Sequence, residues 1–219
     1  MIVIAGGMIR SGSTFAFNVI RELLARTGKV RTFSVNHLEE SEWNPSSPDH
    51  VLVKSHSPDA RLLSAIANGS APCVCTARRP EDAIASWSRA FGFPLEHGIE
   101  MVRTWRDWHD QVRDKVLTVE YKLVDENPGQ AARTIAEFLK IEADPDWFDH
   151  LLQKYEKLAL KNRLDALAND EKTVDIGFSY YDKETFFHRR HISSERSDTA
   201  ENLLTSEQLD TIRAALGTG

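Results

Sequence analysis

Near its start the sequence reads Gly6-Gly7-Met8-Ile9-Arg10-Ser11-Gly12-Ser13-Thr14, between a short apolar run and a segment of helical periodicity. Glycines let the backbone turn tightly and point successive N–H groups inward, and a following helix adds free donors and partial positive charge. The stretch therefore predicts a cradle for a phosphate or a similar anion. It nearly matches the P-loop pattern, but Ser13 stands where the P-loop lysine would be, and Arg10 supplies a cation instead. A P-loop ATPase is therefore disfavoured.

Apolar runs typical of strands alternate with helical patterns through the first two-thirds of the chain. We expect strands at residues 2–5, 30–35, 51–53, 73–77 and 116–119, and helices at 14–27, 58–67, 80–91, 95–114, 128–139, 144–167 and 205–216. Residues 169–200 are polar and lack periodicity. Strands separated by helices favour a parallel sheet covered on both faces.

We therefore predict an α/β fold, a three-layer sandwich with a mostly parallel central sheet. Residues 1–219 form a single domain in this interpretation, with a core at 1–140 and a helical, C-terminal covering part at 141–219.

Composition excludes several classes of protein. The 219 residues carry a net charge of −6, which disfavours a nucleic-acid binder. The mean hydropathy is −0.40, and no apolar run approaches the roughly 18 residues of a membrane helix. The two cysteines, Cys73 and Cys75, are expected in the core rather than in a disulfide or metal site. The first residues lack the charged region of a signal peptide, so we expect a cytoplasmic protein.

Polar residues follow two further strands, where ligands of parallel sheets bind. Lys54 and His56 are two residues apart in an extended segment and point the same way. A cation and an imidazole so placed can act as electrostatic stabiliser and general base. Arg78 ends the next strand, and Ser86 follows on a helix, so that the two could bind one phosphate from two directions.

Together these features resemble the sulfotransferases that use 3′-phosphoadenosine 5′-phosphosulfate (PAPS). The stretch from Arg10 to Phe15 is similar to the family's 5′-phosphosulfate loop, and Lys54-Ser55-His56 to the element that carries its catalytic base. Arg78 through Ser86 is similar to its 3′-phosphate element, and residues 119–139 to its Tyr-containing strand end and the segment that follows. The order of the motifs also agrees, over roughly residues 1–140.

The resemblance implies a role for each of these residues. Backbone N–H groups of residues 11–14 (Ser11, Gly12, Ser13 and Thr14), with the hydroxyls of the last two, would hold the 5′-phosphate. Arg10 and Lys54 would neutralise charge on the phosphosulfate bridge, and His56 would take the acceptor's proton, with its pKa lowered by Lys54. The remaining residues would hold the nucleotide: Phe15 and Tyr121 at the adenine, and Arg78, Ser86 and Arg190 at the 3′-phosphate.

The C-terminal part is less similar to the family. Phe187-His188-Arg189-Arg190-His191 resembles the basic loop that closes on the 3′-phosphate, although His191 replaces its glycine. Arg189 and Arg190 are therefore candidate cofactor-binding residues. Tyr155 is a candidate aromatic on the adenine side, whereas Trp87 is expected in the core.

The family resemblance predicts an enzyme that moves a sulfuryl group from PAPS to a hydroxyl or amine of a small-molecule or glycan-like acceptor. PAP (adenosine 3′,5′-bisphosphate) is the second product, and neither a metal, a nucleic acid nor a membrane is expected as a partner. We expect the acceptor to enter between residues 36–50 and the segments at 91–105 and 178–187.

Three alternatives remain at this point. A P-loop nucleotide kinase would need ATP and Mg²⁺, and Ser13 argues against it. A non-catalytic nucleotide-binding protein would not need both Lys54 and His56. A metal hydrolase built on His188 and His191 would lack a carboxylate or thiol ligand nearby.

Overall fold

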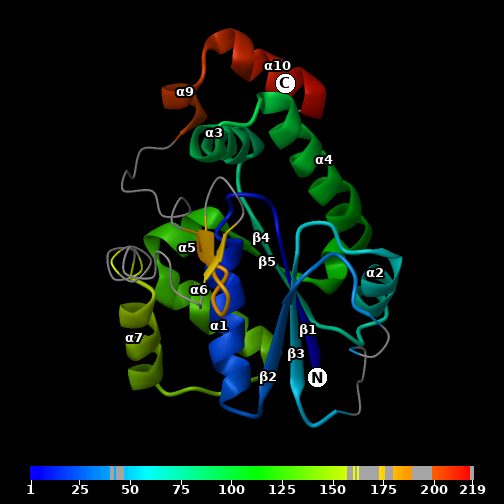
Figure 1. Cartoon of the computed structure of the whole chain (residues 1–219), viewed down its shortest axis with the longest axis vertical. Helices are drawn as coiled ribbons and strands as arrows, with labels where there is room; N and C mark the ends of the chain where they lie inside the picture. The colour runs from blue at the N-terminus through cyan, green and yellow to red at the C-terminus, as the bar shows by residue number, and fades with distance from the viewer. Residues whose placement is uncertain are drawn as a thin grey trace.

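The computed structural model describes residues 1–39, 42, 47–156, 160, 162, 173–175, 180–188 and 199–217. In this part of the chain the central sheet has five parallel strands in the order β2-β3-β1-β4-β5 (Figure 1). The strands are β1 Ile2–Gly7, β2 Val30–Ser34, β3 His50–Ser55, β4 Cys73–Ala77 and β5 Leu117–Glu120. The predicted α/β sandwich with a parallel sheet is confirmed.

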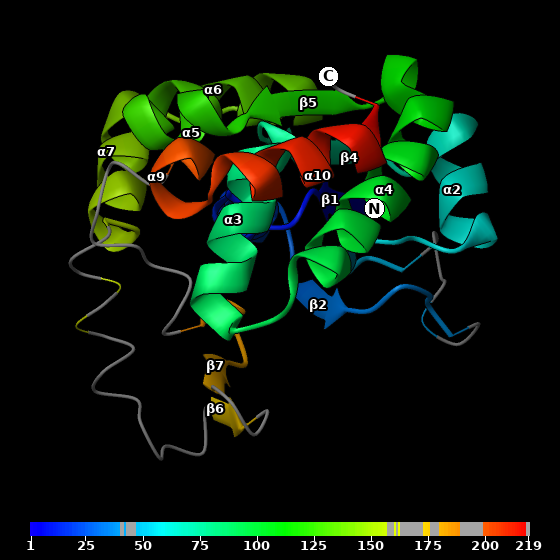
Figure 2. The ribbon, with the colours of Figure 1, turned by 90° about the horizontal axis from the view of Figure 1, so that it is seen from above.

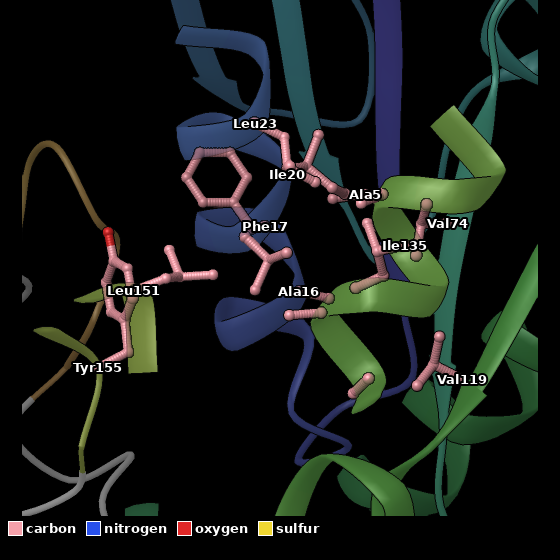
Figure 3. Close-up of a cluster of buried hydrophobic side chains, with 14 of the residues drawn as sticks. Ala5, Ala16, Phe17, Ile20, Leu23, Val74, Val119, Ile135, Leu151 and Tyr155 are labelled. Atoms are coloured by element: carbon pink, nitrogen blue, oxygen red, sulfur yellow. The ribbon is translucent and has the colours of Figure 1, made fainter. Parts of the chain in front are cut away.

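Helices cover both faces of the sheet. One face packs against α1 (Ser13–Ala25), α6 (Pro128–Leu139) and α7 (Pro145–Lys154). Side chains such as Phe17, Ile20 and Ile135 fill the space between these helices and the strands (Figure 3). The opposite face packs against α2 (Ala60–Ala67) and α4 (Leu95–Val112), with Trp105 and Trp108 in its core.

The last helices lie over one end of the molecule. α9 (Ala200–Leu203) packs on α3 (Pro80–Phe91), and α10 (Ser206–Leu216) packs on α3 and α4 (Figure 2). Ion pairs support this arrangement, because the buried Glu81 at the start of α3 binds both Arg79 and Arg213, whose side chains are partly exposed. The backbone N–H of Ala200 also donates to Asp82, which ties α9 to the same helix end.

The register of the sheet brings the ends of its strands together. Gly6 of β1 lies opposite Ser55 of β3, and Gly7 lies opposite Thr76 of β4. The residues that follow β1, β3 and β4 therefore meet at one edge of the sheet, as expected for a parallel arrangement.

Several predicted boundaries are wrong. The helix expected at 144–167 ends at Lys154, and Tyr155 follows with its side chain buried on the α1 side. Residues 157–159, 161 and 163–167 of the expected range lie outside the described part of the chain. The helix expected at 95–114 ends at Val112 and continues as a 3-10 turn, Arg113–Lys115. Residues 169–200, expected without regular structure, contain an antiparallel pair, β6 (Thr173–Asp175) and β7 (Tyr180–Asp182), besides α9. A short helix that was not predicted, α5 (Tyr121–Glu126), follows β5 directly.

Candidate active site

The loop between β1 and α1 is held in one shape by its glycines and by β4. A Cβ on Gly7 would lie 2.4 Å from Cβ of Ser13 and 2.4 Å from Oγ1 of Thr76, so only glycine fits. Arg10 and Gly12 both have positive φ, 55° and 84°, which turns the chain back toward the helix. The hydroxyl of Ser11 donates to the Met8 carbonyl over 2.6 Å and contacts Oγ1 of Thr76. Ser11 therefore shapes the loop with its side chain and can offer a ligand only its backbone N–H.

The loop leads into α1 in the way that an anion site requires. Within the described residues no side chain caps the start of α1, which follows Gly12. Uncapped N–H groups and the helix dipole favour a negative group at this position. Ser13 and Thr14 begin the helix and are nearly buried, and Phe15 is half-buried against the core on the α1 side.

Lys54 and His56 form a pair at the end of β3. Nζ of Lys54 lies 3.2 Å from Nε2 of His56, and Nδ1 of His56 lies 2.5 Å from the Gly7 carbonyl oxygen. Because a carbonyl can only accept, Nδ1 carries the proton and Nε2 presents its lone pair. Trp108 holds the backbone of the same residue, since its indole N–H donates to the His56 carbonyl over 3.0 Å. The imidazole is thus a neutral base whose orientation is fixed from two sides.

Burial and mutual repulsion set the charge of this pair. Burial, and then the positive charge of Lys54, lowers the pKa of His56 to about 3, although the Gly7 hydrogen bond raises it. Burial lowers the pKa of Lys54 to about 8. The sequence predicts a lowered pKa for His56, and this direction is right. Burial, however, lowers the pKa more than the charge of Lys54 does.

Arg10, Arg78, Ser86 and Tyr121 make up a second group on the other side of the loop. Nε of Arg10 donates to Oγ of Ser86 over 3.0 Å, and Ser86 is only 3% exposed. Arg78 donates to the Arg10 carbonyl over 3.2 Å, and its guanidinium lies 4.2 Å from the ring centre of Tyr121. The structure therefore links these four predicted residues in a chain of contacts, from Ser86 through Arg10 and Arg78 to Tyr121.

Two residues from the last third of the chain, His188 and Tyr155, differ in their relation to the site. His188 lies close enough to Lys54 and Arg10 for their positive charges, after burial, to lower its pKa to about 4. Tyr155 was expected at the adenine, but its hydroxyl binds Arg21 and Glu22 on α1, so this interpretation is wrong. Arg189, Arg190 and His191 lie outside the described residues.

Two aromatic residues of the segment expected to border the acceptor pack against the α1 side of the sheet. Phe187 is in the core against α1, and Phe186 packs on Phe17 at 5.0 Å between ring centres. Trp87, expected in the core, is only partly buried at the edge of the α4-side core and contacts Phe91 and Phe93.

Comparison with known proteins decides the family. The family model described as "Sulfotransferase domain" matches residues 8–216 of the chain. The chain belongs to the sulfotransferase domain family.

Solved structures share the fold of this family member at low sequence identity. The mouse sulfotransferase SULT7A1 in complex with PAP is 13% identical, with a TM-score of 0.61 over 98% of this chain and 82% of that one. Retinol dehydratase with androsterone and the inactive cofactor PAP is 14% identical, with a TM-score of 0.62 over 99% and 79%. The same enzyme with retinol and PAP is 15% identical, with a TM-score of 0.59 over 99% and 80%. A search of curated protein sequences gave no match.

Several residues of this sulfotransferase-family site were missed by sequence reasoning. Asn18 and Arg21 are buried polar side chains on α1 that bind the C-terminal segment, and Trp108 fixes His56. Asn18 had a signal in the sequence, because it interrupts the apolar pattern of α1 between Phe17 and Val19. Trp108 had none, since its helical spacing marks only a core residue.

The described residues also bear on metal binding and on membrane insertion. Among the described residues, no group of three or more His, Cys, Asp or Glu side chains could hold a metal ion. None of the helices in the same part of the chain is long and apolar enough to cross a bilayer.

Proposed function

We propose that the protein transfers a sulfuryl group from PAPS to a hydroxyl or amine of a small-molecule or glycan-like acceptor, with His56 as the general base. The observation that carries this proposal is the Lys54–His56 pair, which lies against the Gly7 carbonyl at the mouth of an anion-binding loop. An oriented neutral imidazole beside a cation is what proton abstraction next to a developing negative charge requires.

The loop and the second group of residues would hold the donor. The N–H groups of residues 11–14 and the hydroxyls of Ser13 and Thr14 bind the 5′-phosphate. Phe15 and Tyr121 flank the adenine. Arg78 and Ser86, together with Arg189 and Arg190, bind the 3′-phosphate. This assignment is supported by the contacts among Arg10, Arg78, Ser86 and Tyr121, which place two guanidinium groups next to the loop.

The transfer step follows from these positions. The acceptor oxygen or nitrogen forms a bond to sulfur while Nε2 of His56 takes its proton. The bond between sulfur and the bridging oxygen breaks, and PAP leaves with the electron pair. Lys54 and Arg10 stabilise the negative charge that develops on the leaving phosphate oxygen. The imidazolium of His56 then releases its proton to solvent.

Lys54 must change partner before this step. In the free protein its ammonium group lies on Nε2 of His56, the atom that has to accept the proton. An anionic donor attracts Lys54 toward the bridging oxygen and uncovers Nε2. The base thus becomes available when the donor is in place, which disfavours proton abstraction from a wrongly bound acceptor.

The acceptor class is proposed from the chemistry of the step and from the solved structures of similar fold. Two of those structures hold androsterone and retinol together with PAP, which supports a small acceptor with a hydroxyl group. The test is to incubate the protein with ³⁵S-labelled PAPS and a panel of phenols, alcohols, amines and saccharides. Label should move to one acceptor class with release of one PAP per sulfate transferred. Phosphoryl transfer from Mg·ATP, with no label transferred from PAPS, would contradict the proposal.

A further inference from the structure

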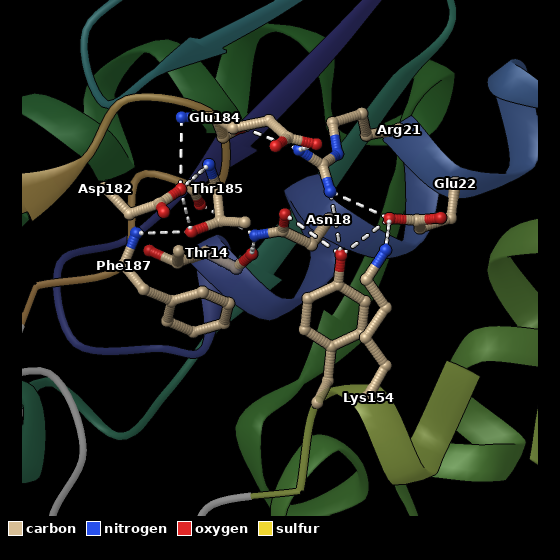
Figure 4. A network of polar contacts seen from close by, with 10 residues as sticks. Thr14, Asn18, Arg21, Glu22, Lys154, Asp182, Glu184, Thr185 and Phe187 are labelled. Atoms are coloured by element: carbon tan, nitrogen blue, oxygen red, sulfur yellow. Dashed lines mark hydrogen bonds and ion pairs between the residues drawn. The ribbon is translucent and has the colours of Figure 1, made fainter. Parts of the chain in front are cut away.

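Residues 182–188 fold back onto α1, the helix that begins at the anion-binding loop (Figure 4). Asn18 makes the connection nearest the loop. Its Nδ2 donates to the Thr14 carbonyl over 2.7 Å and to the Thr185 carbonyl over 2.8 Å, and the side chain is fully buried. One amide therefore joins the first turn of α1 to a segment 167 residues away.

Arg21 makes a second connection one turn further along α1. Nη1 donates to the Glu184 carbonyl over 3.0 Å and pairs with the carboxylate of the same residue at 2.7 Å. Nη2 binds Oε1 of Glu22 and the hydroxyl of Tyr155. Arg21, a residue that is 6% exposed, thus holds this segment through Nη1 and is itself fixed by Glu22 and Tyr155 through Nη2.

Asp182 shapes the turn that carries Glu184 and Thr185, the two residues held by Arg21 and Asn18. Oδ1 of Asp182 accepts hydrogen bonds from the N–H groups of Glu184 and Thr185 and from the Thr185 hydroxyl. Phe186 follows with a positive φ of 53° and packs on Phe17, and Phe187 packs 6.1 Å from the ring of Tyr155. The direction in which the chain leaves Phe187 is therefore fixed.

His188 is the next residue, and it lies at the Phe91 ring that Arg10 also contacts. Its ring lies 6.3 Å from that of Phe91 and 5.2 Å from that of Tyr181. The guanidinium of Arg10 lies 5.8 Å from the same Phe91 ring. His188 and Arg10 therefore lie against the same aromatic ring, and the positive charges of Lys54 and Arg10 both act on the imidazole. A neutral imidazole at this position carries one N–H that can donate to an anionic oxygen.

We propose that His188 is a donor-contact residue that hydrogen-bonds the transferring sulfuryl group, and that Asn18 and Arg21 are positioning residues that place it there. This inference rests on the proposed function, because it assigns His188 to the sulfuryl end of PAPS. PAP has no sulfuryl group. The contact is therefore one that PAPS makes and PAP does not.

Calorimetric titration with PAPS and with PAP, without acceptor, tests this contact. His188→Phe keeps a ring against Phe91 and Tyr181 but removes the N–H. It should weaken PAPS binding by about tenfold, the loss expected for one hydrogen bond to a charged group, and change PAP binding less than threefold. His188→Gln, which keeps an N–H donor, should recover part of the PAPS affinity.

Changes at the positioning residues Asn18 and Arg21 should alter the ratio of PAPS affinity to PAP affinity in the same direction as His188→Phe. Asn18→Ala or Arg21→Met should lower PAPS affinity relative to PAP, and either change should add little in a His188→Phe background, since coupled residues are not additive. Asn127→Ala is the matched control. Asn127 likewise makes a side-chain hydrogen bond at a helix, to the N–H of Gln130, but on α6. It should leave the ratio unchanged.

The outcomes separate this inference from the proposed function. Wild-type protein that binds neither PAPS nor PAP would overturn the proposed function. Wild-type protein that binds both, with a His188→Phe variant of unchanged PAPS-to-PAP ratio, would overturn only the role of His188. An effect of Asn18→Ala or Arg21→Met that is fully additive with His188→Phe would show that neither side chain acts through His188.

Discussion

The ammonium group of Lys54 lies 3.2 Å from Nε2 of His56, whose Nδ1 is bound to the Gly7 carbonyl on the opposite side of the ring. One cation therefore covers the lone pair of the proposed base, and burial keeps both groups out of water. Under the proposed function we expect a negatively charged donor to alter both groups at once, by drawing Lys54 away and making His56 a stronger base.

Replacing the proposed base should separate chemistry from binding. His56→Ala removes the proton acceptor but leaves the anion-binding loop and Arg78 in place. Turnover with labelled PAPS and an identified acceptor should fall by roughly 10²–10⁴, while PAP affinity stays within a few-fold of wild type. His50→Ala is the control, because His50 lies at the other end of β3, against the N-terminus and Thr27. Near-normal turnover of His56→Ala would mean that the base is another residue.

The pH dependence of kcat/KM for the donor should be set by Lys54. His56, with a pKa of about 3, is neutral from pH 5 upward in the free protein, so no rise near pH 6.5 is expected. Lys54, with a pKa of about 8, loses its proton and its positive charge as the pH rises through that value. Because kcat/KM reports ionisations of the free enzyme, it should be flat from about pH 5 to 7 and fall above about pH 8. Lys54→Arg should move this fall to higher pH, and a profile that still falls near pH 8 in that variant would exclude Lys54 as its cause.

The two adjacent arginines after β4 should differ in their effect on the cofactor. Arg78→Ala removes the guanidinium that contacts Arg10 and Tyr121, and should weaken PAP binding by about 2–5 kcal/mol. Arg79→Ala is the matched control, since Arg79 forms ion pairs with Glu201 and Glu81. It should lower stability slightly and leave PAP affinity almost unchanged. Equal losses of PAP affinity in the two variants, measured by calorimetry, would show that Arg78 acts through local structure or net charge alone.

The loop itself should tolerate no side chain at Gly7. Gly7→Ala places a methyl group 2.4 Å from Ser13 and Thr76, so the loop or β4 must shift. We expect a loss of about 1–3 kcal/mol in the free energy of unfolding by urea, together with a marked loss of PAP affinity. Gly129→Ala is the control, because the nearest atom to the new methyl group is the flexible end of Leu152, at 3.2 Å. Unchanged stability of Gly7→Ala would contradict the described loop geometry.

The sheet and the first half of the site could be predicted because they depend on local sequence. Each candidate site residue up to Tyr121 lies at the end of a strand or in the loop or helix that follows one, and parallel pairing brings those strand ends to one edge. Lys54, His56 and Arg78 could therefore be placed together before any contact was known. Their exact partners, such as the Gly7 carbonyl and Ser86, depend on register and on the course of the loop.

The C-terminal contribution could not be predicted in the same way. Asn18 and Thr185 are 167 residues apart, and nothing in either local sequence shows that they touch. The aromatic residues at 186 and 187 could equally have lined an acceptor pocket. Phe187 is a core residue instead, and Phe186 packs against the same core, because the Asp182 turn directs both toward the α1 side.

The central claim, that the site is built for a 3′-phosphorylated adenosine nucleotide, is tested most directly by thermal unfolding with PAP and with Mg·ATP. A ligand that binds only the folded protein stabilises it by about 2.7 kcal/mol at a hundredfold excess over its Kd. PAP without Mg²⁺ should therefore raise the melting temperature by several degrees, and Mg·ATP at the same concentration should change it little. Equal or greater stabilisation by Mg·ATP would contradict the account.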